Sequence, residues 1–191
     1  MGGGDRTGPA AGVAAARGLA AVASRAGVRV DFLSGDRGVR SRLGGASRAT
    51  LLRDRVTAMA PLEPARLEAD WSMMAGAIAA ISRRRSLVIL LTPLEPAAIE
   101  ESLLPTLATL TRHHRVVLAS VADPALSAMA ADVTSTSRVY DAAAAERTIG
   151  QRERTAEELG RLGDHVIDAE HEQVTVDLTA HSLRLRSSGL M

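Results

Sequence analysis

The chain of 191 residues contains no cysteine, which excludes disulfide bonds, thiolate metal sites and cysteine nucleophiles. All 23 basic side chains are arginine, so lysine-dependent phosphate loops and Schiff-base chemistry are excluded too. The net charge of +1 divides into +7 over residues 1–85 and −6 over residues 86–191, an asymmetry that can mark a nucleic-acid face. The only aromatic residues are Phe32, Trp71 and Tyr140, too few for a base-stacking platform, so we expect a protein-facing surface and no nucleic-acid partner.

The sequence predicts a single soluble domain. No window approaches the roughly 18 consecutive apolar residues that cross a bilayer, and no signal-peptide pattern opens the chain. We therefore expect a cytoplasmic protein without membrane insertion. The glycine-rich residues 1–9 are expected to be flexible, and residues 10–191 to form one domain.

The first third of the chain predicts helices around a β-hairpin. The alanine-rich residues 10–26 predict a helix that Gly27 ends. Alternating apolar residues predict strands over 28–33 and 39–43, joined by a turn, with the second strand at a sheet edge. A further helix is expected over 47–59.

In the middle of the chain, helical patterns alternate with apolar runs. Asp70 is a candidate N-cap for a helix. That helix has apolar residues at helical spacing, which are Trp71, Met74, Ile78 and Ile81. The arginines of 83–85 follow, where cations complement the exposed carbonyl groups of a helix end. Residues 86–91 are typical of a strand buried on both faces, and the next helix should begin at Pro96 and kink at Pro105.

The last third repeats this alternation. Residues 115–122 predict a second buried strand, and Asp123 should start a short helix. Residues 141–163 predict a long charged helix, and 165–169 a short strand. The tail, 174–190, fits both a strand and a helix, and we predict a helix.

These elements predict an α/β fold. We expect a doubly wound, mainly parallel sheet with helices on both faces and an antiparallel edge hairpin, because helices of crossover length separate the strands. Ligands of such sheets bind outside the carboxyl ends of the strands. The segments to inspect are therefore 34–38, 92–95 and 122–124.

No pattern of catalytic chemistry accompanies this fold. There is no glycine-rich phosphate loop after a strand and no Gly-x-Ser-x-Gly elbow, and the histidines show no metal-ligand spacing. They are His113, His114, His165, His171 and His181. We therefore expect no cofactor and no enzymatic activity. The alternative is a small α/β enzyme or nucleotide-binding protein that uses the strand ends without a standard motif.

One stretch carries a resemblance to a known family. The segment "RRRSLVILLTPLEPAAIEESLLPTLATLTRHHRVVLASVADPAL", residues 83–126, resembles the bacterial family called domain of unknown function 58. The strings "ASRAGVRVDFL" and "VYDAAAAERT" support it, and the match runs from about Gly4 to the end of the sequence. The C-terminal portion of that family is similar to a von Willebrand factor A domain, whose strand ends can carry a metal-ion-dependent adhesion site.

The resemblance also implies that this site is degenerate. Three loops supply the oxygen ligands in that fold: an Asp-x-Ser-x-Ser motif, a Thr before a helix, and an Asp after a strand. The motif has no counterpart after Gly4, Ala69 precedes Asp70 in the second loop, and Pro93 stands in place of the Asp in the third. Asp70 and the Thr92 hydroxyl alone should not hold a divalent ion, so we expect no metal.

The resemblance further implies that a central strand is missing. That strand would lie between the strands predicted at 28–33 and 86–91, and its loss would leave backbone donors and acceptors unpaired. An upstream segment, direct pairing of the two flanking strands, a strand-completing partner or a homo-oligomer would solve this. Many family members are encoded near MoxR-type AAA ATPases, which implies such an ATPase as the partner of a non-enzymatic protein-interaction module.

Overall fold

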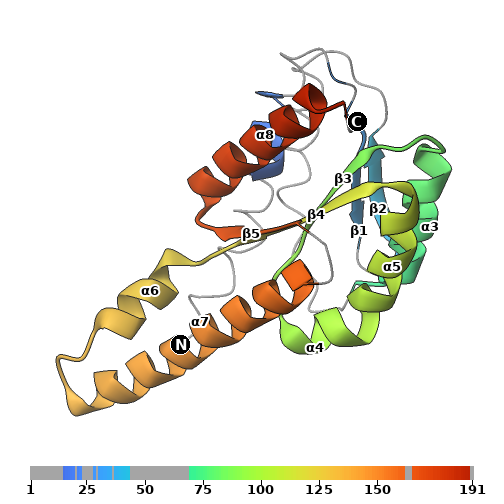
Figure 1. The fold of residues 1–191 in the computed structure, drawn as a ribbon. Helices are drawn as coiled ribbons and strands as arrows, with labels where there is room; N and C mark the ends of the chain where they lie inside the picture. Colours follow the sequence, from blue (N-terminus) through green and yellow to red (C-terminus); the bar gives the residue numbers. More distant parts are fainter. Residues whose placement is uncertain are drawn as a thin grey trace.

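The structure is a computed structural model that describes residues 15–19, 21–22, 28, 30–35, 37–43, 69–161 and 165–189 (Figure 1). The flexible segment expected at 1–9 and the helix expected over 47–59 lie outside these residues. Within them, the predicted α/β class is confirmed, with a small parallel sheet and helices on both faces.

Three parallel strands form the centre of the fold. They are β3 (Leu87–Leu91), β4 (Arg115–Val121) and β5 (His165–Ala169), in the spatial order β3-β4-β5. Leu87 lies opposite Arg115, and Val117 lies opposite His165. The bounds of all three strands agree with the predicted ones to within one residue.

The predicted hairpin forms, but it does not join this sheet. It consists of β1 (Phe32–Gly35) and β2 (Val39–Leu43), which pair antiparallel as a separate two-stranded sheet. The expectation of an edge hairpin on the parallel sheet is therefore wrong for the described residues.

The first strand of the hairpin begins at Phe32, later than predicted, and ends at Gly35. A Cβ on Gly35 would lie 2.5 Å from the carbonyl oxygen of Gly38, so this tight turn requires glycine.

One face of the parallel sheet carries the larger core. It is covered by α3 (Trp71–Ile81), α4 (Pro96–Ala98), the π-helix η1 (Ile99–Leu103), α5 (Leu104–His113) and the second half of α7 (Thr136–Arg161). Leu90 and Leu118 point to this side from the strands and contact Leu103, Leu107 and Leu159. Val88 packs on the same side, and because side chains alternate along a strand, Leu87, Ile89 and Leu91 point to the other face.

The opposite face is covered by α8 (His171–Ser187) and by the helical residues 15–19 and 21–22 (Figure 1). Val117, Ala119 and Ile167 from the sheet meet Val174 and Leu178 of α8. The helix predicted for the tail is thus confirmed, and its face toward the sheet contains these two fully buried residues.

The kink expected at Pro105 takes the form of a π-helical turn. Pro105 lacks an N–H and its ring would clash with a carbonyl of the preceding turn, so the chain widens over Ile99–Leu103 before α5 begins. Ile99 and Leu103 are both buried there. The π-helical turn therefore accommodates the proline and also buries two apolar residues in the core.

Two helices form an arm that extends away from the sheet (Figure 1). They are α6 (Pro124–Ala131) and the first half of α7, which begins at Thr136 rather than at the predicted Asp141. The Ser135 hydroxyl accepts a hydrogen bond from the Arg138 N–H, and Asp132 binds Thr134 and the Arg138 guanidinium. These local bonds extend the helix by one turn beyond its strongly helix-forming residues.

Candidate functional site

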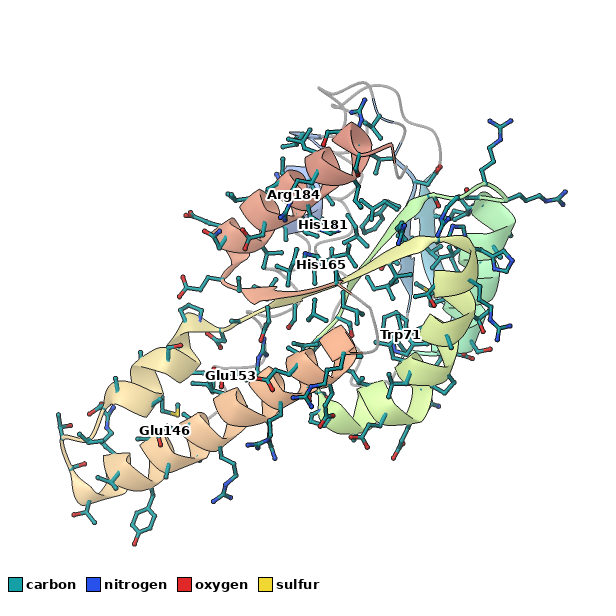
Figure 2. The ribbon with its side chains drawn as sticks, in the orientation of Figure 1. Trp71, Glu146, Glu153, His165, His181 and Arg184 are labelled. Atoms are coloured by element: carbon teal, nitrogen blue, oxygen red, sulfur yellow. The ribbon has the colours of Figure 1, made fainter. Side chains whose placement is uncertain are left out.

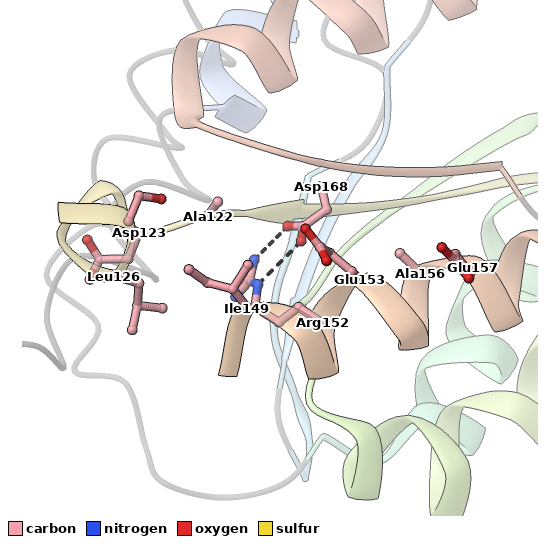
Figure 3. A pocket seen from close by; sticks show the side chains of 10 residues that line it. Ala122, Asp123, Leu126, Ile149, Arg152, Glu153, Ala156, Glu157 and Asp168 are labelled. Atoms are coloured by element: carbon pink, nitrogen blue, oxygen red, sulfur yellow. Dashed lines mark hydrogen bonds and ion pairs between the residues drawn. The ribbon is translucent and has the colours of Figure 1, made fainter. Parts of the chain in front are cut away.

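An open cleft lies at the carboxyl ends of β4 and β5, one of the places where the fold predicts a ligand. Its volume is about 460 Å³, and α6, α7 and the two strands line it (Figure 3). Ala122 and Asp123 form one wall, within the predicted segment 122–124. Asp123 also caps α6, because its carboxylate accepts a hydrogen bond of 2.9 Å from the Ala125 N–H.

Arg152 is the central side chain of this cleft. From α7 it donates two hydrogen bonds to Asp168 of β5, Nη2 to Oδ1 at 2.5 Å and Nε to Oδ2 at 3.3 Å (Figure 3). Nη2 also donates to the hydroxyl of Ser120 at 2.9 Å, and Ser120 is buried in β4. One guanidinium thus ties a helix to two strands, with the fork geometry that makes Arg–carboxylate pairs strong.

The charges around the cleft favour a cationic rather than an anionic ligand. Its lining contains one arginine and four carboxylates, those of Asp123, Glu153, Glu157 and Asp168. Since Asp168 already neutralises Arg152 and the lining contains three further carboxylates, the cleft offers a phosphate group little electrostatic attraction. The arrangement suits a structural link between α7 and the sheet better than it suits phosphate binding.

Sequence reasoning missed Arg152, Asp168 and Ser120. One signal was present: α7 has a stripe of small and apolar residues at helical spacing, and Arg152 stands in the middle of it. The stripe consists of Ala145, Ile149, Ala156 and Leu159. An arginine within such a stripe requires a buried or half-buried acidic partner.

The residues of the expected degenerate adhesion site make local contacts. The Asp70 carboxylate accepts a hydrogen bond of 2.9 Å from the Met73 N–H and so caps α3, as predicted. The Thr92 hydroxyl donates to the carbonyl of Pro93 at 3.4 Å, and Pro93 is exposed. Among the residues that the structure describes, no three imidazole or carboxylate groups are grouped as metal ligands would be.

Three of the histidines lie in structured environments. His114 is the C-cap of α5 and is buried, and its Nδ1 lies 3.0 Å from the hydroxyl of Ser86. Burial and the neighbouring His113 lower the pKa of His114. His165 of β5 stacks on His181 of α8, and Figure 2 shows the pair between these elements.

The outer edge of β3 is the second feature that bears on function. Arg115 donates its N–H to the Ser86 carbonyl and Thr92 donates to the Ala119 carbonyl, so the even-numbered residues of β3 face β4. The backbone groups of Leu87, Ile89 and Leu91 therefore face the other edge. No strand among the described residues pairs with that edge, and β1 does not close it.

Comparison of the chain with protein-family models, with characterised proteins and with solved structures gives no significant match. The described helices include none that is long and apolar enough to cross a bilayer.

Proposed function

We propose that this chain is a non-enzymatic protein-interaction module whose partner adds a strand to the outer edge of β3. The observation that carries this proposal is the mismatch between the environment of β3 and its place in the sheet. β3 contributes side chains to the cores of both faces, which is typical of an interior strand, yet it lies at the edge of the described sheet.

The energetic reason for a strand partner is the exposed backbone. The N–H and C=O groups of Leu87, Ile89 and Leu91 point along the sheet, between apolar side chains, where water is a poor substitute for a hydrogen-bonded strand. An added strand would satisfy these groups through main-chain hydrogen bonds. Since the side chains of both faces are apolar here, the incoming strand should be apolar on both of its faces.

The family resemblance suggests the class of partner. We propose that the chain is a diverged relative of the domain of unknown function 58 family, with a von Willebrand factor A-like fold and a degenerate adhesion site at Asp70, Thr92 and Pro93. Three parallel strands with helices on both faces support that topology at a coarse level. On this proposal a MoxR-type AAA ATPase is the partner, and the chain functions in the cytoplasm.

The competing function, a nucleotide-binding protein or small enzyme, would use the cleft at Ala122 and Asp123. Its location at the strand ends favours that role. The excess of carboxylates and the pairing of Arg152 with Asp168 argue against it. A thermal-shift panel of nucleotides, each with Mg²⁺, separates the two functions, because a ligand of the native state raises its unfolding temperature.

The direct test combines the purified chain with a purified MoxR-type ATPase from the same organism and measures association and amide exchange. We expect a complex in which exchange of the Leu87, Ile89 and Leu91 amides slows. The Ile89→Pro variant removes an outward N–H while sparing the bonds to β4, and it should lose binding. Val176→Asp, an exposed site on α8, should bind normally.

Three results would contradict the proposal. Absence of a complex would show that the ATPase is not the partner. A complex in which amide exchange at β3 is unchanged would show that the partner does not add a strand there. Stabilisation of the chain by a nucleotide would favour the competing function instead. Circular dichroism of Ile89→Pro must show the wild-type fold; if it does not, strand addition is judged from amide exchange in the wild-type complex.

A further inference from the structure

We infer that the amino ends of β3 and β4 bind an acidic segment of a partner protein through a cluster of six arginines. Three segments carry this arginine cluster: the loop before β3, the junction of α5 with β4, and the end of α8. Five of the side chains are exposed and that of Arg115 is half-buried. The members of the cluster are Arg83, Arg84, Arg85, Arg112, Arg115 and Arg184.

Hydrogen bonds hold the first two segments together. The Arg115 N–H donates to the Ser86 carbonyl at 2.9 Å, and the Ser86 hydroxyl lies 3.0 Å from Nδ1 of His114. The Ser82 hydroxyl donates to the Arg84 carbonyl at 2.9 Å, which stabilises the bend before β3. The arginines before β3 and those around the start of β4 therefore lie side by side.

The third segment reaches the same end of the sheet from the opposite face. α8 begins after the carboxyl end of β5 and runs back over the sheet, so that His181 stacks on His165 at the start of β5. Figure 2 shows Arg184 beside this pair. Because side chains alternate along β4, Arg115 points to the face that α8 covers. The cluster thus extends from α5 on one face to α8 on the other.

The charge of the cluster is not compensated within the described part of the chain. Residues 82–86, 111–115 and 181–189 contain no acidic residue. None of the six guanidinium groups forms an ion pair with a described carboxylate, and the buried Nε of Arg115 has no acceptor among the described residues. The carboxyl ends of α3, α5 and α8 each carry about half a negative charge, which offsets about a quarter of the six positive charges.

The remainder of the sequence does not supply the missing acid. The residues outside the described part include seven arginines and six acidic residues, so they have no acidic surplus. An external anion is therefore the complement of this surface.

An acidic polypeptide fits the cluster better than a nucleic acid or a membrane. Guanidinium groups bind carboxylates through two parallel hydrogen bonds, and arginine clusters are a recurring means of recognising acidic segments. The three aromatic residues lie in the hairpin, in α3 and in α7, so no ring is placed to stack on a base. Leu183 is the one exposed large apolar residue in the three segments, too few to insert into a lipid surface.

Fluorescence anisotropy with a fluorescein-labelled peptide of ten glutamates tests the inference on the whole chain. We expect binding at 0.1 M NaCl that weakens at least tenfold at 1 M NaCl, where the screening length falls from about 10 Å to about 3 Å. Arg84→Glu/Arg85→Glu should weaken binding at least tenfold at 0.1 M NaCl. Arg147→Glu/Arg154→Glu changes the net charge equally at two exposed sites of α7 and should bind like the wild type.

Nuclear magnetic resonance of the arginine Nε–H groups locates the bound peptide on the wild-type chain. The signals of Arg84, Arg85 and Arg112 should shift during a titration, whereas those of Arg147 and Arg154 should not. If circular dichroism shows that Arg84→Glu/Arg85→Glu does not fold, these shifts decide the outcome.

Three outcomes would overturn the inference. One is a peptide that does not bind at millimolar concentration, and another is an equal loss of binding in both double variants, which would show that net charge alone matters. The third is tighter binding of ten-nucleotide DNA, single-stranded or duplex, or of phosphatidylserine vesicles, because the cluster would then recognise phosphate. These assays contain no ATPase, so their outcome is independent of strand addition at β3.

Discussion

The imidazole rings of His165 and His181 stack almost in parallel, with centroids 3.8 Å apart and an angle of 11° between their planes. His165 comes from the start of β5 and His181 from α8, so the stack joins the sheet to the helix that covers it. Burial and the charge of Arg184 lower the pKa of both rings, while Asp177 partly opposes this shift at His165. Both shifts therefore favour the neutral form of the two rings.

This stack makes the stability of the fold depend on pH. A histidine whose pKa is lower in the folded than in the unfolded chain binds protons preferentially after unfolding, so the stability it contributes is lost as pH falls below about 6.5. We expect the thermal midpoint to fall steadily from pH 7 to pH 5. His181→Phe should keep the ring contact and make this fall shallower, with the residual slope coming partly from His114. An identical slope in wild type and variant would contradict this assignment.

The Arg152–Asp168 pair should stabilise the contact between α7 and the sheet. Its side chains are only 17% and 18% exposed, so Arg152→Ala leaves a half-buried carboxylate without its partner. We expect a loss of about 2 kcal/mol in the free energy of unfolding, measured by urea titration. Arg152→Lys should restore little, because a single ammonium cannot reproduce the two-pronged contact.

A double-mutant cycle supplies the control for that pair. Arg152→Ala combined with Asp168→Ala should cost less than the sum of the two single changes, since both single changes remove the same interaction. Additive costs would show that the two side chains do not interact in solution.

A cavity in the core on the α5 side of the sheet should lower the stability of the fold. Leu118 is fully buried in β4, and Leu118→Ala should lower the free energy of unfolding by about 3 kcal/mol. Leu183→Ala, at a position 51% exposed, should change it by less than about 0.5 kcal/mol. Denaturant unfolding of both variants measures the difference, and similar costs at the two positions would place Leu118 outside the core.

Gly18 lies where the N-terminal helical residues approach α8. A Cβ added there would stand 2.7 Å from the Cγ2 of Thr175, which is closer than real carbon contacts allow. Gly18→Ala should therefore lower the thermal midpoint, although alanine favours a helix by about 1 kcal/mol over glycine. Adding Thr175→Ser removes the Cγ2 and should recover part of the loss. A Gly18→Ala variant with a raised midpoint would show that the two helices are not in contact.

The sequence predicted the parallel sheet well because its strands are buried on both faces. Such strands appear as unbroken apolar runs, as in Leu87–Leu91 and in the centre of β4. The start of α7 was predicted too late because Thr136, Val139 and Tyr140 have weak helix propensity. In the structure, the contact with α6 and the hydrogen bonds around Asp132 determine where the helix begins. The start of β1 was placed too early, since alternation alone does not show where pairing with β2 begins.

The candidate sites were harder to predict. The segment 122–124 was correctly expected at a cleft, because topology alone places the strand ends together. The partners of Arg152 lie 16 and 32 positions away in the sequence, and only the folded arrangement of α7, β4 and β5 brings them within hydrogen-bond distance. His165 and His181 are paired for the same reason.

The two faces of the sheet differ in when they can be completed during translation. The larger core is built from elements between Trp71 and Val166, whereas the other face needs Ala15 near the start of the chain and Leu178 of α8 near its end. Until the ribosome has completed α8, no helix packs on Val117, Ala119 and Ile167 from that side. These residues then form an apolar surface exposed to solvent. Nascent chains should therefore depend on chaperones up to that moment, and a ribosome stalled before α8 should leave a half-covered sheet that is prone to aggregate.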